Sequence, residues 1–170
     1  MARKAAHAAV GLVIFVASPW FELWQFISLC VFFFGLLLGY RFLSTSSVYH
    51  LEKNYGDVLY PLGLLVLGLS LYGLPNAFLG GVLVLALADV AAYVAGRMKG
   101  HSNSKTWFGF LAFGLTAGLV LVNFLPWEQA ILLTILTALI ERFSPYGSDN
   151  LTIPMVYVAG YALSASFFIS

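Results

Sequence analysis

Seven apolar stretches divide this chain, and they constrain its fold more than any other feature of the sequence. They span about residues 5–18, 20–40, 58–74, 76–97, 106–125, 127–142 and 151–170. Several are near the ~17–20 residues that an α-helix needs to cross a hydrocarbon layer about 30 Å thick. Only 9% of the residues are charged, whereas a soluble domain carries about 25%. We therefore predict an all-α, polytopic integral membrane protein with about seven transmembrane helices.

The chain is expected to form a single domain over residues 1–170, because no linker or low-complexity segment interrupts it. The first stretch also resembles a signal peptide, but cleavage after Ser18 would leave Pro19 at the new N-terminus, so a first transmembrane helix is the better interpretation. The single cysteine, Cys30, excludes an intramolecular disulfide. A net charge of +1 gives no indication of nucleic-acid binding.

The distribution of positive charge predicts the orientation in the membrane. With seven spans, all eight Lys and Arg residues fall on one side, and the connections around 18–20, 74–76 and 123–127 contain none. Loops that face the cytoplasm carry the excess of Lys and Arg. We therefore expect the N-terminus and the three long polar loops, about 41–57, 97–106 and 141–154, to lie in the cytoplasm.

A carboxylate stands in the middle of the fourth apolar stretch. A charged side chain inside a membrane span costs roughly 2.5–3.5 kcal/mol on insertion scales, so Asp89 requires an explanation. Beside it, Ala88, Ala92 and Gly96 recur every fourth residue and form a stripe on which another helix can pack closely. Asp89 is either a structural residue bonded to a neighbouring helix or part of a site for a cation or polar substrate.

Oxygen ligands of the kind that Mg²⁺ prefers gather in the third polar loop. Glu141 ends one apolar stretch, and Asp149 and Asn150 begin the next. Either of the latter two could simply cap the last helix. Together with Asp89, however, they supply the donor chemistry of a magnesium site. We expect Asp89, Glu141 and Asp149 to be the metal-binding and catalytic carboxylates.

Cations for phosphate binding stand in the neighbouring loop, at Arg97, Lys99 and Lys105. Carboxylates, cations and an adjacent lipid phase together indicate phosphoryl or nucleotidyl transfer to a lipid. Motifs of soluble enzymes do not fit. The stretch from Gly100 to Thr106 lacks the second glycine of a P-loop, no GxGxxG is present, and the three histidines match no zinc spacing.

Several short motifs, in order along nearly the whole chain, resemble those of the polyprenol kinases, the CTP-dependent membrane kinases that include dolichol, phytol and farnesol kinases. The motifs are Arg3-Lys4-x-x-His7, Tyr60-Pro61-x-Gly63, Asp89-x-x-Ala92 with Gly96-Arg97, Lys105-Thr106-x-x-Gly109, and Glu141 followed by Asp149-Asn150-x-x-x-Pro154. The resemblance implies transfer of the γ-phosphate of CTP to a long-chain isoprenoid alcohol, with a divalent cation such as Mg²⁺. It places the nucleotide on a set formed by Arg97, Lys99, Lys105, Thr106 and Asn150.

The chain departs from the family at two positions. Phe108 stands where dolichol kinases usually have a glutamate, and Phe110 stands where a serine or threonine follows the glycine. Trp107 is more similar to the phytol and farnesol kinase branch. Three alternatives stay open: an inactive relative, a cytidylyltransferase that forms CDP-lipids, and a small transporter or channel with Asp89 as its ion site. The cytidylyltransferase signature is absent, and a transporter should show polar groups toward both sides and an internal repeat.

Overall fold

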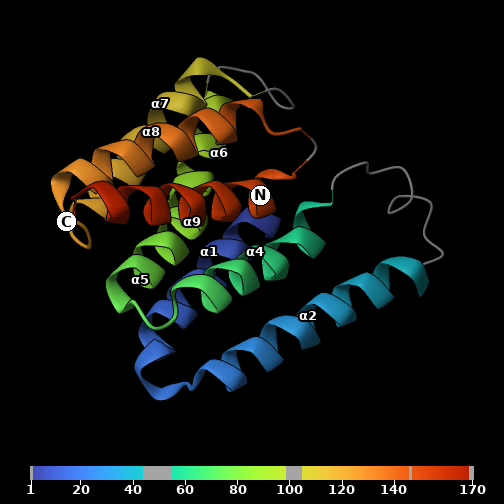
Figure 1. The fold of residues 1–170 in the computed structure, drawn as a ribbon. Coiled ribbons are helices and arrows are strands. Elements are labelled where there is room, and N and C mark those ends of the chain that lie inside the picture. Colours follow the sequence, from blue (N-terminus) through green and yellow to red (C-terminus); the bar gives the residue numbers. More distant parts are fainter. Residues whose placement is uncertain (1, 44–54, 99–104, 146, 169–170) are drawn as a thin grey trace.

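The computed structural model describes residues 2–43, 55–98, 105–145 and 147–168 (Figure 1). Within these ranges the regular secondary structure is helical, which confirms the all-α prediction. The elements are α1 (Ala2–Ala17), the 3₁₀ turn η1 (Ser18–Trp20), α2 (Leu23–Leu43), α4 (Gly56–Leu71), α5 (Pro75–Leu83), η2 (Val84–Ala88), α6 (Asp89–Met98), α7 (Trp107–Leu121), α8 (Trp127–Phe143) and α9 (Asp149–Phe168).

A continuous helical rod, Pro75–Met98, forms the centre of the bundle. Pro75 occupies its first turn, where a missing N–H costs nothing. The rod runs through α5, a π-helical segment η2 and α6. Such π segments inside α-helices often mark functional sites. Here η2 ends immediately before Asp89, so the change in helical winding adjoins the buried carboxylate.

The other helices are arranged around this rod (Figure 1). The rod packs against α1, α4, α7 and α9, whereas α8 fits between α7 and α9, and α2 lies outside against α4. The core is built from the inner faces of these helices, with Leu67, Val84, Phe113 and Leu133 fully buried. The apolar stretches of the sequence thus become helices packed on a shared core.

Glycines allow two of the helix pairs to approach closely. A Cβ at Gly109 of α7 would lie 3.0 Å from the backbone oxygen of Ala92 in α6. This contact confirms that the small-residue stripe of α6 is a packing face. In the second pair, Gly63 of α4 lies against the backbone of Asn150 and the ring of Pro154 in α9. Motifs far apart in the sequence therefore meet through helix packing.

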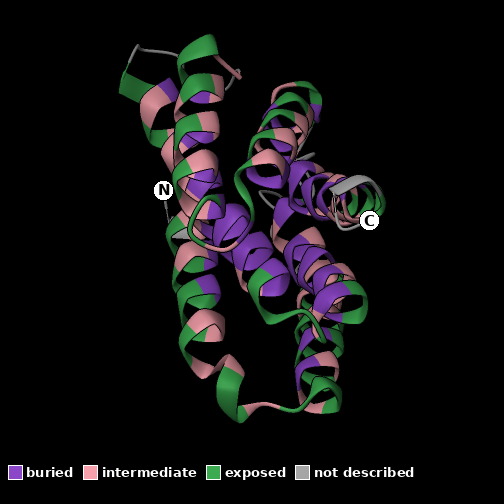
Figure 2. Cartoon of the chain, turned by 60° about the vertical axis from the view of Figure 1, so that its left-hand side comes forward, coloured by how far each residue is buried: buried purple, intermediate pink, exposed green. Residues whose placement is uncertain are grey.

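Figure 2 shows which residues are exposed on the outside of the bundle. Many of the exposed residues are large and apolar. Among the described residues, two helical stretches, Leu23–Leu43 and Pro75–Met98, are long and apolar enough to cross a membrane. Leu23–Leu43 is mostly exposed and Pro75–Met98 mostly buried. Large exposed apolar surfaces mark contacts with lipid or with another protein. Exposed residues of this kind include Val13, Val16, Phe32, Phe33, Leu36, Leu115 and Leu119.

Candidate functional site

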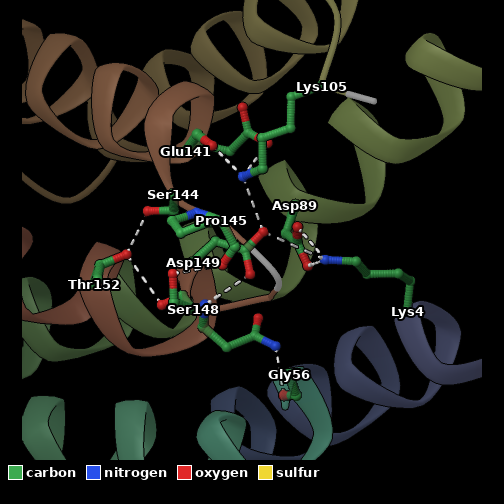
Figure 3. A network of polar contacts seen from close by, with 11 residues as sticks. Lys4, Gly56, Asp89, Lys105, Glu141, Ser144, Pro145, Ser148, Asp149 and Thr152 are labelled. Atoms are coloured by element: carbon green, nitrogen blue, oxygen red, sulfur yellow. Dashed lines mark hydrogen bonds and ion pairs between the residues drawn. The ribbon is translucent and has the colours of Figure 1, made fainter. Parts of the chain in front are cut away.

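An ionic cluster lies where several helix ends converge (Figure 3). It consists of Lys4 near the start of α1, Asp89 at the start of α6, Lys105 just before α7, Glu141 near the end of α8 and Asp149 at the start of α9. The three carboxylates are almost completely buried. Because a buried charge is costly unless it is paired, the two lysines are essential to this arrangement.

Lys4 neutralises the carboxylate in the central rod. Its ammonium group contacts both carboxylate oxygens of Asp89, and it lies 4.0 Å from Oδ2 of Asp149. Asp89 is 3% exposed. A partner for this buried carboxylate is required, and the structure identifies it as a residue 85 positions earlier in the chain.

Lys105 joins the other two carboxylates. Its Nζ lies 3.0 Å from Oε1 of Glu141 and 3.1 Å from Oδ2 of Asp149, and it also donates to the backbone oxygen of Glu141. The lysine belongs to the segment before α7, whose first turn is capped by Thr106. The end of α8 and the start of α9 are thus held together by one ammonium group.

Asp149 connects the two lysines. Its Oδ2 faces both ammonium groups, and its Oδ1 accepts a hydrogen bond from the Asn150 N–H at 3.0 Å. Burial alone would raise the pKa of Asp149, but the charges of Lys4 and Lys105 outweigh it and hold the pKa below its ordinary value. Asp149 is therefore ionised at neutral pH.

The turn before α9 is fixed by hydrogen bonds among small polar residues (Figure 3). Ser148 Oγ donates to the Pro145 carbonyl at 2.8 Å, and Thr152 Oγ1 donates to the Ser148 carbonyl at 3.0 Å. Ser144 and Thr152 share a hydrogen bond of 2.6 Å. Gly147 has a φ of 79°, a left-handed conformation that favours glycine. These contacts hold Asp149 in position.

The structure brings together most, but not all, of the residues predicted for the site. Asp89, Glu141, Asp149 and Lys105 form the cluster, and Asn150 adjoins it. The roles assigned to them stay predictions.

Two members of the predicted nucleotide set make other contacts, and a third is not described. Arg97 is exposed at the end of α6, where its Nη1 donates to the Tyr93 hydroxyl at 2.8 Å. Thr106 accepts from the Gly109 N–H at 3.0 Å as the N-cap of α7, a structural role. Lys99 lies outside the described residues.

Lys4 is the site residue that the sequence analysis did not select. The signal for it was present, because Lys4 stands in the Arg3-Lys4-x-x-His7 motif. The first helix was expected to act as a membrane span, and its charges were used only to orient the chain. Only the packing of α1 against η2 and α6 brings Lys4 to Asp89.

The donor chemistry of the cluster fits a divalent cation. Three buried carboxylates face two ammonium groups, so the fully ionised cluster has one excess negative charge. In the part of the chain that the structure describes, no three His, Cys, Asp or Glu side chains are already grouped as a metal cage. The oxygens are bonded to lysines instead. Asn150 Oδ1 is a further oxygen donor, buried and without a hydrogen-bond partner. All of these are ligands that Mg²⁺ accepts.

The structure thus defines an apolar helical bundle with a buried ionic cluster of three carboxylates and two lysines. No family model and no solved structure matches the chain. A curated relative, phytol kinase from Synechocystis sp., is 32% identical over 174 aligned residues, which cover 90% of this chain and 74% of the relative. The chain belongs to the polyprenol and phytol kinase family of lipid-alcohol kinases.

Proposed function

We propose that this protein transfers the γ-phosphate of CTP to a long-chain isoprenoid alcohol at the cytoplasmic end of a seven-helix membrane bundle. The observation that carries the proposal is the ionic cluster, in which buried carboxylates and lysines lie at the end of an apolar bundle. Kinship with phytol kinase supports the reaction class. The choice of CTP comes from the motif resemblance.

The two cluster lysines are suited to bind the phosphates of the nucleotide. In the unliganded protein, Lys4 and Lys105 are bonded to carboxylates. A triphosphate carries more negative charge than the carboxylates it would replace, so it can attract both ammonium groups. A lysine on a phosphate neutralises charge that develops during phosphoryl transfer.

The carboxylates released by the lysines are suited to hold Mg²⁺. Asp89, Glu141 and Asp149 would be the ligands, with Asn150 Oδ1 as a neutral oxygen donor. The ion would supply neutralisation of the phosphate charge and alignment of the transferred group. The protein residues position the alcohol oxygen in line with the γ-phosphorus. An oxygen–phosphorus bond then forms as the bond between the γ-phosphorus and the bridging oxygen breaks, and CDP leaves.

The proposed membrane topology is supported by the arrangement of charge. Lys4, Lys105 and the adjacent ends of α4, α8 and α9 lie close together at one end of the bundle. Lipid-facing helices explain why α2 and α1 expose apolar side chains. The positive-inside rule then orients the cluster and the N-terminus toward the cytoplasm. An alcohol in the bilayer can reach the cluster along these apolar faces with its hydroxyl foremost.

The test is phosphorylation of defined alcohols by purified protein. Protein in detergent with Mg²⁺ and γ-labelled CTP is mixed with phytol, farnesol, dolichol, undecaprenol or diacylglycerol. Label in a lipid phosphate confirms the kinase, and the preferred alcohol identifies the substrate. A parallel reaction supplies a lipid phosphate as acceptor, and transfer of label from α-labelled CTP to it would make the protein a cytidylyltransferase. No transfer from either nucleotide to any alcohol would overturn the proposal.

A further inference from the structure

A ring of contacts beside the ionic cluster contains a histidine, His7, that has no role in the function proposed above. His7 of α1 stacks on Tyr60 of α4, with ring centroids 4.1 Å apart and an interplanar angle of 12°. The Tyr60 hydroxyl donates to the His7 backbone oxygen at 2.8 Å. One turn before Tyr60, the Gly56 carbonyl accepts from Nδ2 of Asn150 at 2.6 Å. Helices α1, α4 and α9 are thus joined at the level of the cluster.

Two buried polar atoms in this ring lack hydrogen-bond partners. They are Nδ1 of His7 and Oδ1 of Asn150, and the residues are 7% and 1% exposed. A buried group left without a partner costs about 1–3 kcal/mol. Asn150 is oriented by its bond to Gly56, so its free atom is an acceptor. An acceptor without a partner beside an ionic cluster indicates a ligand that brings either a cation or a hydrogen-bond donor.

The position of His7 fits the hydroxyl of a lipid alcohol. It lies three residues after Lys4, so both side chains share one face of α1, about 5–6 Å apart at Cβ. Lys4 in turn contacts Asp89 and faces Asp149. One turn further along, Val10 is exposed on the outer surface. Along α1, His7 therefore lies between the exposed Val10 and Lys4, the lysine proposed to bind phosphate.

The cluster carboxylates are less suited to take a proton. Each of Asp89, Glu141 and Asp149 is bonded to a lysine ammonium group, which favours its ionised form but occupies its oxygens. In the ligand-bound enzyme they are the candidate metal ligands. Nδ1 of His7 has no hydrogen-bond partner among the described residues, and His7 is not a candidate metal ligand. General acid–base catalysis by such a group contributes about 10²–10⁴-fold.

We propose that Nδ1 of His7 binds the hydroxyl of the alcohol substrate and takes its proton during transfer. This inference rests on the proposed kinase function and adds the catalytic base. The alcohol oxygen gives an electron pair to the γ-phosphorus as its O–H bond breaks, and the proton goes to Nδ1. The bond from the γ-phosphorus to the leaving CDP breaks, and the imidazolium later releases the proton to water. Asn150 Oδ1 lies at the boundary between this subsite and the cluster.

The first test uses His7→Asn, which keeps a polar group at the level of Nδ1 but cannot take a proton. We expect kcat to fall about 100-fold, with the KM for CTP within threefold of wild type. The defect should shrink for a fluorinated long-chain alcohol, because a more acidic hydroxyl needs less help from a base. A kcat within threefold of wild type would overturn the proposal, as would an equal defect for both alcohols.

The second test needs no active variant. Wild-type protein labelled with ¹⁵N-histidine is mixed with phytol or with phytyl methyl ether, which has no hydroxyl hydrogen. The Nδ1 resonance of His7, assigned by substituting His50 and His101, should shift with phytol and stay unchanged with the ether. Equal responses to both ligands, or none to phytol in an active enzyme, would exclude the hydroxyl contact. A wild-type protein without kinase activity would instead disprove the proposed function.

Discussion

Lys4 and Asp89, 85 positions apart in the chain, form a buried ion pair in which one ammonium group contacts both oxygens of one carboxylate. The pair joins the first helix to the central rod of the bundle. The pair also stabilises the ionised form of Asp89, because a buried carboxylate without a counterion is costly. In the proposed kinase, Lys4 would be one of the cations that bind a nucleotide phosphate.

Asp89→Asn should lower kinase activity by about 100-fold or more, because the amide keeps the shape but cannot neutralise a cation. The Mg²⁺ dependence should also weaken. The matched control is Glu128→Gln, which removes a carboxylate from the first turn of α8, outside the cluster. Activity and Mg²⁺ titrations of both variants provide the measurement. Full activity in Asp89→Asn would reduce Asp89 to a structural contact between helices.

The Lys4–Asp89 pair should contribute to stability as a unit. Lys4→Met and Asp89→Asn each leave one partner without its counterion, whereas the double variant leaves neither. A double-mutant cycle on thermal unfolding in detergent should therefore give a coupling energy of about 0.5–3 kcal/mol. Additive effects would show that the pair does not stabilise the folded protein.

Lys105→Ala should raise the KM for CTP roughly tenfold and change the KM for the alcohol much less. The expected loss is that of a charge-assisted contact with a phosphate. Steady-state kinetics with each substrate varied in turn gives the comparison. A change confined to the alcohol KM would show that Lys105 does not bind the nucleotide.

The stabilising effect of Asp149 should persist to low pH. Its pKa is below the ordinary value of about 3.9, so its charge stabilises the fold above that pH and is lost as the pH falls through the lowered pKa. The difference in unfolding free energy between wild type and Asp149→Asn should stay constant from pH 7 to about pH 5. It should shrink only below about pH 4. A difference that vanishes between pH 7 and 5 would mean a raised pKa.

Gly63→Ala should destabilise the protein by about 1–3 kcal/mol. The added Cβ would meet the Asn150 backbone and lie 2.9 Å from Cγ of Pro154. It would also move Asn150 and so lower activity. Gly35→Ala is the control, because a Cβ there meets nothing within 4 Å and alanine favours the helix by about 0.5–1 kcal/mol. Thermal unfolding of both variants should show opposite signs.

The two ends of the bundle should face opposite compartments. Ser148 lies in the turn beside the cluster, and Asn76 lies in the first turn of α5 at the other end. Cysteines at these positions, on a Cys30→Ser background, should react with an impermeant maleimide from opposite sides of sealed vesicles. Reaction from the same side would disprove the proposed topology.

The helices and their approximate bounds could be predicted from the sequence. A long apolar stretch in or near a membrane must satisfy its backbone hydrogen bonds internally, so it becomes a helix whatever its neighbours do. The presence of Asp89, Glu141 and Asp149 in a polar cluster could be predicted for a related reason. Each is a carboxylate in or beside an apolar stretch, and burial forces such groups to find partners.

The identity of those partners was decided by tertiary structure alone. Arg97 stands on the same helix as Asp89 and was expected to bind phosphates. Eight residues turn a helix by about 80° beyond two full turns, and the Arg97 guanidinium donates to Tyr93 on its own helix. Lys4 takes the place beside Asp89 because α1 packs against η2 and α6. The sequence determined which charges had to be paired. Helix packing determined the pairs, because the distance between side chains on different helices depends on how those helices cross. Close contacts such as that of Gly63 with Asn150 set where the helices cross.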